Sequence, residues 1–167
     1  MTSSLAKLMR QSFSNQAETV SIEKEVEYVR SYLTIQKMRY KDKLEFEIKI
    51  DQDIRQIEIV KLILQPLVEN AIYHGIKYKE EIGLIQIEGL ECDGKIQLII
   101  KDNGAGMNAE TLEHILDEKK ENKHSNGVGV YNVHMRLQLY YGPQYGVRYE
   151  SVLGEGTKVT VTIPGRG

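Results

Sequence analysis

The chain contains a single cysteine, Cys92, among its 167 residues, so an internal disulfide bond is excluded. It also lacks any apolar run close to the roughly 20 residues that a membrane-spanning helix needs. Its first residues do not have the pattern of a signal peptide. A lone thiol is typical of a reducing compartment. From these absences we expect a soluble chain in the cytosol.

An excess of either charge is also missing. The chain has 22 Lys and Arg residues, 24 Asp and Glu residues and a net charge of −2, which provides no basic surface for nucleic acid. Hydrophobic residues make up 41% of the chain, enough for a core. The length fits one domain, or one domain with an appendage.

The spacing of apolar residues predicts an α+β fold. Helical spacing is weak over 5–13 and clear over 22–40, where Ser21 is the expected N-cap. Further helices are predicted at 58–75, 108–119 and 128–141, and strands at 44–51, 84–91, 95–102, 145–152 and 157–163. Because the strands come mostly as sequential pairs, we expect a two-layer α/β sandwich. Its sheet would be mixed and mostly antiparallel, with helices on one face.

The apolar helix at 58–75 carries polar residues that need partners, because burying an unpaired carboxylate or amide costs several kcal/mol. Asn70 and His74 are four residues apart and share a helix face, whereas Glu69 is rotated by about 100°. All three could be capped or surface residues. Alternatively, the Asn70 carbonyl oxygen binds Mg²⁺, Glu69 orients a water or acts as a base, and His74 donates to a phosphate.

Three loops contain paired glycines: Gly104 and Gly106, Gly127 and Gly129, Gly154 and Gly156. Any one of them alone is compatible with an ordinary turn. Asp102, at the end of a strand, could start an Asx-turn. It could also accept a hydrogen bond from an exocyclic amine while the glycines let a flat ring approach. The pair at 127 and 129 opens a helix whose N-terminus suits phosphate. Neither a P-loop nor the dinucleotide fingerprint is present.

Together these motifs resemble a known family. "LQPLVENAIYHG", "DNGAGM", "GVGVYNVHMRL" and "GEGT" occur in the order of the N, G1, G2 and G3 boxes of the GHKL ATPases. With "YLTIQKMRY" upstream, they are similar to bacterial sensor histidine kinases of the LytS/YesM-like subfamily over residues 20–164. The resemblance implies the Bergerat ATP-binding fold, with ATP and Mg²⁺ as ligands. It divides the chain into a linker and helix (1–40) and a catalytic domain (41–167).

The resemblance also implies roles for individual residues. Asn70 would be the Mg²⁺ ligand, and Asp102 would accept from the adenine amine. The lid would lie at about 113–126, and Glu69 matches an acid of the N box that we give a catalytic role. The full set of expected ATP-binding residues is Asn70, His74, Asp102, Gly104, Gly106, Met107, Gly127, Val128, Gly129 and Thr157.

The sequence departs from the family in one respect, since no acceptor-histidine box of the P-H-F-x-x-N kind is present. All four histidines, His74, His114, His124 and His134, fall within the pocket-forming motifs or the lid. We therefore expect the catalytic piece of a longer membrane-anchored kinase that lies on the cytoplasmic side of the plasma membrane. Its partners would be its own upstream acceptor region, a second copy of the full-length protein, and a response regulator.

Three other functions are compatible with parts of this pattern. A GHKL ATPase that drives a clamp would need a further domain with a catalytic lysine, and little chain follows residue 164. A serine kinase of the anti-sigma type would not be expected to carry "YLTIQKMRY". A non-enzymatic binding module would not be expected to retain all four boxes.

Overall fold

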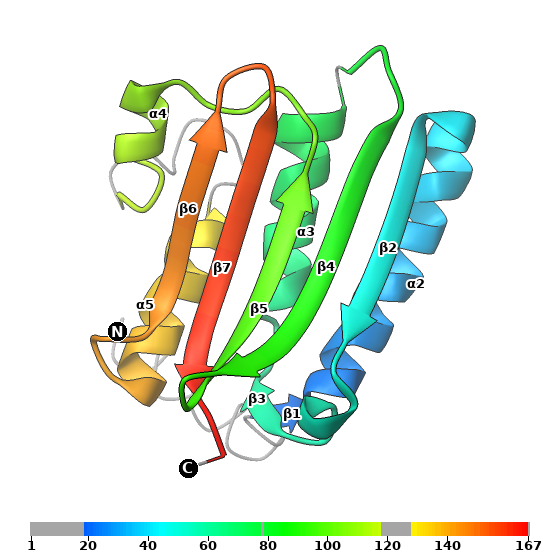
Figure 1. The fold of residues 1–167 in the computed structure, drawn as a ribbon. Coiled ribbons are helices and arrows are strands. Elements are labelled where there is room, and N and C mark those ends of the chain that lie inside the picture. The colour runs from blue at the N-terminus through cyan, green and yellow to red at the C-terminus, as the bar shows by residue number, and fades with distance from the viewer. Residues whose placement is uncertain (1–18, 78, 118–127, 167) are drawn as a thin grey trace, which may run out of the picture.

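The computed structural model describes residues 19–77, 79–117 and 128–166, and Figure 1 shows their arrangement. Short 3₁₀ turns at Lys41–Lys43 and Gln52–Ile54 flank strand β2. The remaining elements, in chain order, are β1 (Thr19–Ser21), α2 (Ile22–Tyr40), β2 (Leu44–Ile50), β3 (Glu58–Val60), α3 (Leu64–Asn70), its π-helical continuation (Ala71–Ile76), β4 (Gly83–Cys92), β5 (Lys95–Asp102), α4 (Ala109–Glu113), α5 (Val128–Tyr141), β6 (Gly146–Val152) and β7 (Gly156–Pro164).

The main sheet has five strands in the order β2-β4-β5-β7-β6. The β2–β4 pair is parallel, and the other three pairs are antiparallel. Strands β1 and β3 form a separate antiparallel pair at the start of α2. The expected mixed, mostly antiparallel sheet is confirmed.

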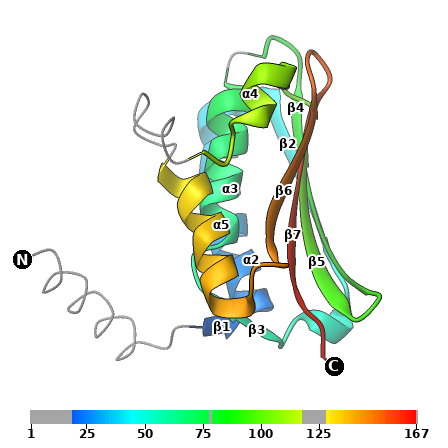
Figure 2. The same cartoon turned by 90° about the vertical axis from the view of Figure 1, so that its left-hand side faces the viewer.

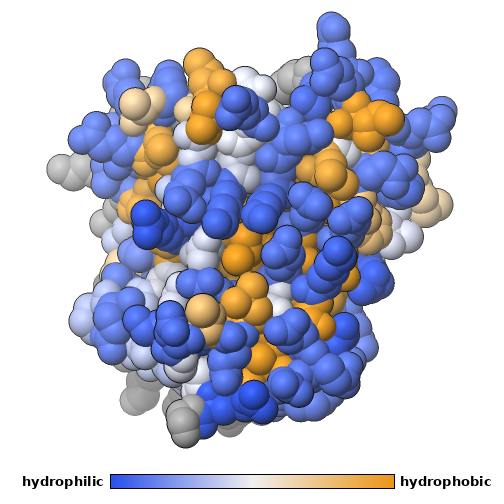
Figure 3. All heavy atoms as spheres, viewed as in Figure 1, coloured by the Kyte–Doolittle hydropathy of each residue, from blue (hydrophilic) through white to orange (hydrophobic). Residues whose placement is uncertain are grey.

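The helices α2, α3 and α5 cover one face of this sheet, as the side view in Figure 2 shows. Alternate residues of the strands point at them and are buried, for example Ile85 and Ile87 of β4 and Val159 and Val161 of β7. The opposite face is open and mostly hydrophilic (Figure 3). The two-layer sandwich predicted from the sequence is therefore confirmed.

The predicted helix over 58–75 begins too early. Residues 58–60 are strand β3, which pairs with β1, and the helix starts only at Leu64. Between them, Leu62 has a φ of 62°, a left-handed conformation that interrupts any helix. The helix also continues past the expected end, because Ala71–Ile76 forms a π-helical segment. Apolar spacing alone could not separate strand from helix in this run.

The limits of the other predicted helices differ less from those in the structure. Ser21 caps α2 as expected, accepting from the Lys24 amide at 3.1 Å, and α5 has the predicted limits. The helix predicted at 108–119 is shorter, because α4 ends at Glu113. The pair β1–β3 was not foreseen. The helix predicted at 5–13 and most of the expected lid lie outside the described residues.

Helix α3 is held at its start by a buried acid from another helix. Glu25 of α2 is 2% exposed, and its carboxylate accepts from the backbone amides of Leu62, Ile63 and Leu64 at 2.5, 3.2 and 3.1 Å. These amides have no partner within the helix, and a negative charge at a helix N-terminus is favourable. Arg136 of α5 donates to the Leu62 carbonyl at 3.1 Å. The segment that leads into α3 is thus held between α2 and α5.

Among the helices of the described residues, none is both long enough and apolar enough to cross a membrane.

We predict that Glu25→Gln lowers the free energy of unfolding by about 1–3 kcal/mol, because charge-assisted bonds to two buried amides and one part-buried amide are lost. Glu27→Gln, an exposed position on the same helix, is the matched control and should leave stability unchanged. Urea unfolding of both variants measures the difference. Equal midpoints for the two variants would show that the Glu25 contacts do not stabilise the fold.

Candidate functional site

A cavity of about 310 Å³ lies between α3, the loop after β5, α4 and the β6–β7 pair. The polar side chains that face it come from four separate segments of the chain. Its lining includes six of the expected ATP-binding residues, namely Asn70, His74, Asp102, Gly106, Met107 and Thr157. The structure therefore brings together residues that are up to 87 positions apart, from Asn70 to Thr157.

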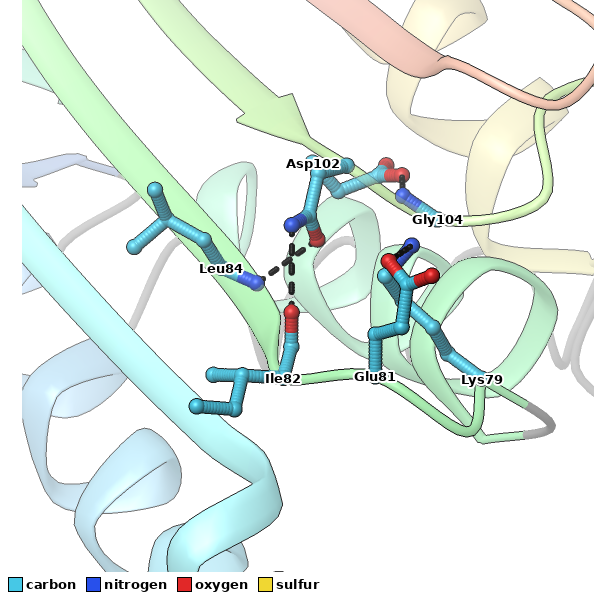
Figure 4. Close-up of polar contacts among 7 residues, drawn as sticks. Lys79, Glu81, Ile82, Leu84, Asp102 and Gly104 are labelled. Atoms are coloured by element: carbon cyan, nitrogen blue, oxygen red, sulfur yellow. Dashed lines mark hydrogen bonds and ion pairs between the residues drawn. The ribbon is translucent and has the colours of Figure 1, made fainter.

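Asp102 is the half-buried acid of this cavity. It ends strand β5, and its carboxylate accepts from the Gly104 amide at 2.8 Å (Figure 4). Burial raises the pKa of this carboxyl from 3.8 to about 6, although hydrogen bonds from the Gly104 and Thr157 backbones and the charge of Lys79 lower it. A carboxylate that is poorly compensated in this way has spare acceptor capacity for a ligand.

Three glycines allow the backbone to close around Asp102. A Cβ at Gly75 would lie 2.8 Å from the Asp102 carboxylate, and one at Gly104 would lie 2.3 Å from the Gly75 carbonyl oxygen. A Cβ at Gly156 would lie 2.0 Å from the Asp102 carbonyl oxygen. The Ala105 amide also donates to the Gly75 carbonyl at 3.2 Å. These glycines are therefore required by packing, and they join the π-helical segment, the β5 loop and β7 at one point.

Asn103, the residue after Asp102, fixes the direction in which strand β5 ends. The side-chain oxygen of Asn103 accepts from the Leu84 amide at 2.7 Å, and its nitrogen donates to the Ile82 carbonyl at 3.1 Å. Both bonds tie the end of β5 to the start of β4 and leave Asp102 on the opposite, helix-facing side (Figure 4). Lys79 forms an ion pair with Glu81 at 3.8 Å beside them.

A hydrogen-bond network around Ser151 of β6 holds the loop after β5 against the β6–β7 hairpin. The Ser151 hydroxyl accepts from the Met107 amide at 2.8 Å and lies 2.8 Å from the Thr157 hydroxyl. The Gly154 amide donates to the Ala105 carbonyl at 2.7 Å. A Cβ at Gly106, whose φ is 69°, would come within 2.1 Å of the Val152 carbonyl oxygen. Gly106 and Thr157 thus shape the cavity wall, and their expected roles towards a nucleotide stay predictions.

Asn70 and Tyr149 meet at the inner wall of the cavity. Tyr149 comes from β6, and its hydroxyl oxygen is buried without a hydrogen-bond partner among the described residues. Burial raises its pKa well above the usual value, while the Asn70 side chain, which lies close by, lowers it. The Asn70 amide therefore faces both the tyrosine and the cavity.

Glu69 is not brought together with Asn70 and His74. It lines a different pocket, between α3 and α2, together with Tyr32 and Arg39. Its carboxylate accepts from the Gln65 side chain at 3.2 Å. This agrees with the rotation of about 100° expected from helix geometry. The catalytic role expected for Glu69 stays a prediction.

The G2 glycines are placed only in part. Gly127 and the Val128 side chain lie outside the described residues. Gly129 lies in the first turn of α5, where a Cβ would lie 3.1 Å from the Pro66 side chain. It therefore lets α5 approach α3 closely, and it does not line the cavity described above.

Residues that build the cavity beyond the expected ones include Gly75 and Tyr149, which line it, and Ser151, whose hydroxyl holds its wall without lining it. Gly75 is the last residue of the quoted N-box motif, but no role was assigned to it from the sequence. For the other two the signal was strand alternation, because Val147, Tyr149 and Ser151 fall on the helix-facing side of β6.

The donors of the cavity suit magnesium better than a metal held by several side chains. Among the described residues, no group of three or more His, Cys, Asp and Glu side chains could hold a metal ion. The Asn70 amide can supply one oxygen, and Mg²⁺ needs few protein ligands when phosphates and water complete its shell.

Comparison with known proteins places this architecture in a family. Residues 55–167 match the family model described as histidine kinase-, DNA gyrase B- and HSP90-like ATPase, and residues 1–44 match a model described as histidine kinase. The chain belongs to the histidine kinase-, DNA gyrase B- and HSP90-like ATPase family.

Its relatives include named sensor kinases. Sensor histidine kinase YesM of Bacillus subtilis is 34% identical over 99% of this chain, and sensor histidine kinase YpdA of Escherichia coli is 33% identical over 88%. These matches cover 27% and 25% of the relatives, so the chain spans about a quarter of their length.

Solved structures show the same fold. The catalytic domain of histidine kinase ThkA superposes with a TM-score of 0.67 at 19% identity, covering 87% of this chain and 93% of that domain. Acinetobacter baumannii histidine kinase AdeS gives a TM-score of 0.64 at 18% identity, covering 98% of this chain and 77% of that one.

The Asp102 environment predicts an effect of pH on stability. A carboxyl whose pKa is raised in the folded state stabilises the fold below about pH 4, and this contribution is lost as pH rises through about 6. Asp102→Asn removes the buried charge and should raise the free energy of unfolding at pH 8 by about 1–3 kcal/mol. The gain should shrink towards pH 4. Urea unfolding at both pH values measures it, and a variant less stable than wild type at pH 8 would contradict the assignment.

Proposed function

We propose that this chain binds ATP with Mg²⁺ and is the catalytic domain of a sensor histidine kinase. The observation that supports this most directly is the half-buried Asp102 carboxylate in a cavity that glycines build. Each carboxylate oxygen can accept more than one hydrogen bond, so Asp102 can also accept from the exocyclic amine of adenine. The glycine-lined loops leave room for a flat ring beside it. The names of the relatives support the kinase class.

The phosphates would lie towards Asn70 and His74. Asn70 is the side chain through which the chain would hold Mg²⁺, because it lines the cavity and its amide supplies the oxygen that hard cations prefer. His74 would contact a phosphate from the same helix face. Bound Mg²⁺ would supply positive charge to the transferring phosphoryl group. The glycines at 127 and 129 retain their expected role at the phosphates as part of this proposal.

The acceptor histidine would lie in a part of the full-length protein that precedes this chain. His134 has a structural role, because its Nδ1 accepts a hydrogen bond from the Val147 amide at 3.0 Å. Burial lowers the pKa of its imidazole. His114 pairs with Asp117 at 2.6 Å. His74 lines the cavity itself. Each of these histidines therefore already has a place in or beside the cavity or in the core.

The larger assembly is proposed by analogy with the sensor kinases. The phosphoryl group would pass from the acceptor histidine to a cognate response regulator, and the full-length protein would act as a homodimer. This chain would be its cytoplasmic part, attached to a plasma-membrane receptor. Residues 1–40 would connect the acceptor region to a catalytic domain at 41–167.

We predict that Asn70→Ala abolishes the Mg²⁺ dependence of nucleotide binding while the fold is kept. Calorimetric titration with ATP, in Mg²⁺ and in a chelator, measures this. Gln56→Ala is the control, since Gln56 is exposed and its side chain bonds only Glu23 at 2.7 Å among the described partners. Equal Mg²⁺ dependence in wild type and Asn70→Ala would show that Asn70 is not the metal ligand.

We also predict that the chain alone binds ATP but does not phosphorylate itself on histidine. Phosphoryl transfer needs an acceptor held in line with the γ-phosphate. Adding the upstream acceptor helix should restore transfer, and tethering it should work better than mixing, because a tether raises the effective concentration. The assay uses γ-labelled ATP and scores acid-labile, base-stable label. Stoichiometric label of that type on residues 1–167 alone would contradict the proposal.

A further inference from the structure

Tyr149 contributes a polar atom to the inner wall of the cavity that the fold does not use. Its strand neighbours alternate, so Val147, Tyr149 and Ser151 point to the helix layer while Arg148 and Glu150 point to the open face. The Ser151 hydroxyl is fully engaged by Met107, Gly156 and Thr157. The Tyr149 hydroxyl, by contrast, is buried and has no hydrogen-bond partner within the described part of the chain.

An apolar side chain at position 149 would fill the same space without the cost of burying an unpartnered hydroxyl. Tyr149 lies opposite Val159 in the β6–β7 ladder, and the cavity wall around it includes Leu67 and Val159. Leaving the Tyr149 hydroxyl unpartnered there costs free energy in the ligand-free protein. A hydrogen bond that this hydroxyl forms when a ligand is bound would offset that cost. Hydrogen bonds at functional sites are often long or poorly aligned in the empty protein and tighten when the ligand binds.

The group best placed to become that partner is the Asn70 side chain, which lines the same cavity. An asparagine amide has one oxygen and one nitrogen that point in different directions, and only the oxygen can bind a cation. A neighbour that accepts from Nδ2 therefore turns Oδ1 away from itself.

We propose that Tyr149 is a positioning residue of the nucleotide site. Its hydroxyl oxygen accepts a hydrogen bond from Asn70 Nδ2 and thereby holds Asn70 Oδ1 in the orientation that binds Mg²⁺. The inference depends on the proposed function, because it assigns a role towards the metal–nucleotide complex. It adds a residue from the strand layer to a site otherwise described through the N and G boxes.

The decisive variant is Tyr149→Phe, which keeps the ring and removes only the hydroxyl. The affinity for a non-hydrolysable ATP analogue in Mg²⁺ should fall about tenfold, because outer-shell partners of metal ligands typically have effects of this size. In a chelator, the affinity should stay within about twofold of wild type. The thermal midpoint of the ligand-free variant should be equal or higher, because a buried unpartnered hydroxyl has been removed. Tyr28→Phe, at a site 46% exposed on α2, is the control.

A second background tests the mechanism of the effect. In Asn70→Asp, both ends of the side chain are oxygens, so its orientation no longer matters. The added Tyr149→Phe should then change the Mg²⁺-dependent affinity by less than about twofold, which a double-mutant cycle measures. A full tenfold loss in this background would overturn the proposed orienting role.

The other outcomes also decide the question. An equal loss of affinity with and without Mg²⁺ would mean that the hydroxyl contacts the nucleotide directly, and unchanged affinity in both conditions would mean that it has no role. Either result overturns the inference while leaving ATP binding intact. Failure of the wild-type chain to bind the analogue in Mg²⁺ would instead contradict the proposed function.

Discussion

The close approach of backbone to the Asp102 carboxylate is the constraint on which the cavity depends. Gly75, Gly104 and Gly156 come from three different elements, and none of them leaves space for a Cβ. Their contacts hold the π-helical segment, the end of β5 and the start of β7 together around a charge. The acid is kept partly desolvated, which raises its pKa and leaves acceptor capacity in the cavity. Structural stability is reduced locally in exchange for a site that can recognise a ligand.

A second constraint joins this site to the rest of the helix layer. Glu25 of α2 binds the first amides of α3, and Arg136 of α5 binds the carbonyl of Leu62 just before that helix. The helix that carries Asn70 and His74 is therefore fixed at its start by both neighbouring helices. Helix α2 also begins directly after β1, which pairs with β3 next to the same segment. The position of the Asn70 side chain thus depends on α2, near the start of the described chain, and on α5, near its end.

The sequence was informative where a residue pattern has one structural solution. Strand alternation predicted β4, β5 and the helix-facing side of the sheet, and Ser21 predicted the start of α2. Two polar residues of the apolar helix, Asn70 and His74, line one cavity, and their roles towards a ligand stay predictions. The run at 58–75 failed because apolar residues suit a buried strand and a buried helix equally. Only the pairing with β1, which is distant in sequence, decides between them.

The finer features of the site follow from tertiary contacts that local patterns do not encode. The separation of Glu69 from Asn70 was expected from helix geometry, but the pocket that Glu69 lines depends on where α2 packs. Gly75 has no local pattern that marks it, and its need for a small side chain arises only from Asp102 and Gly104. Tyr149 looked like an ordinary strand residue, and its hydroxyl becomes relevant to the site only because the Asn70 side chain lies next to it.

The most direct test of the account is a crystal structure of residues 1–167 with Mg²⁺ and a non-hydrolysable ATP analogue. We predict that the adenine amine lies within about 3 Å of the Asp102 carboxylate. We further predict that Asn70 Oδ1 binds Mg²⁺ at roughly 2.1 Å. A nucleotide bound in another part of the chain, or in this cavity with its base away from Asp102, would contradict the central claim.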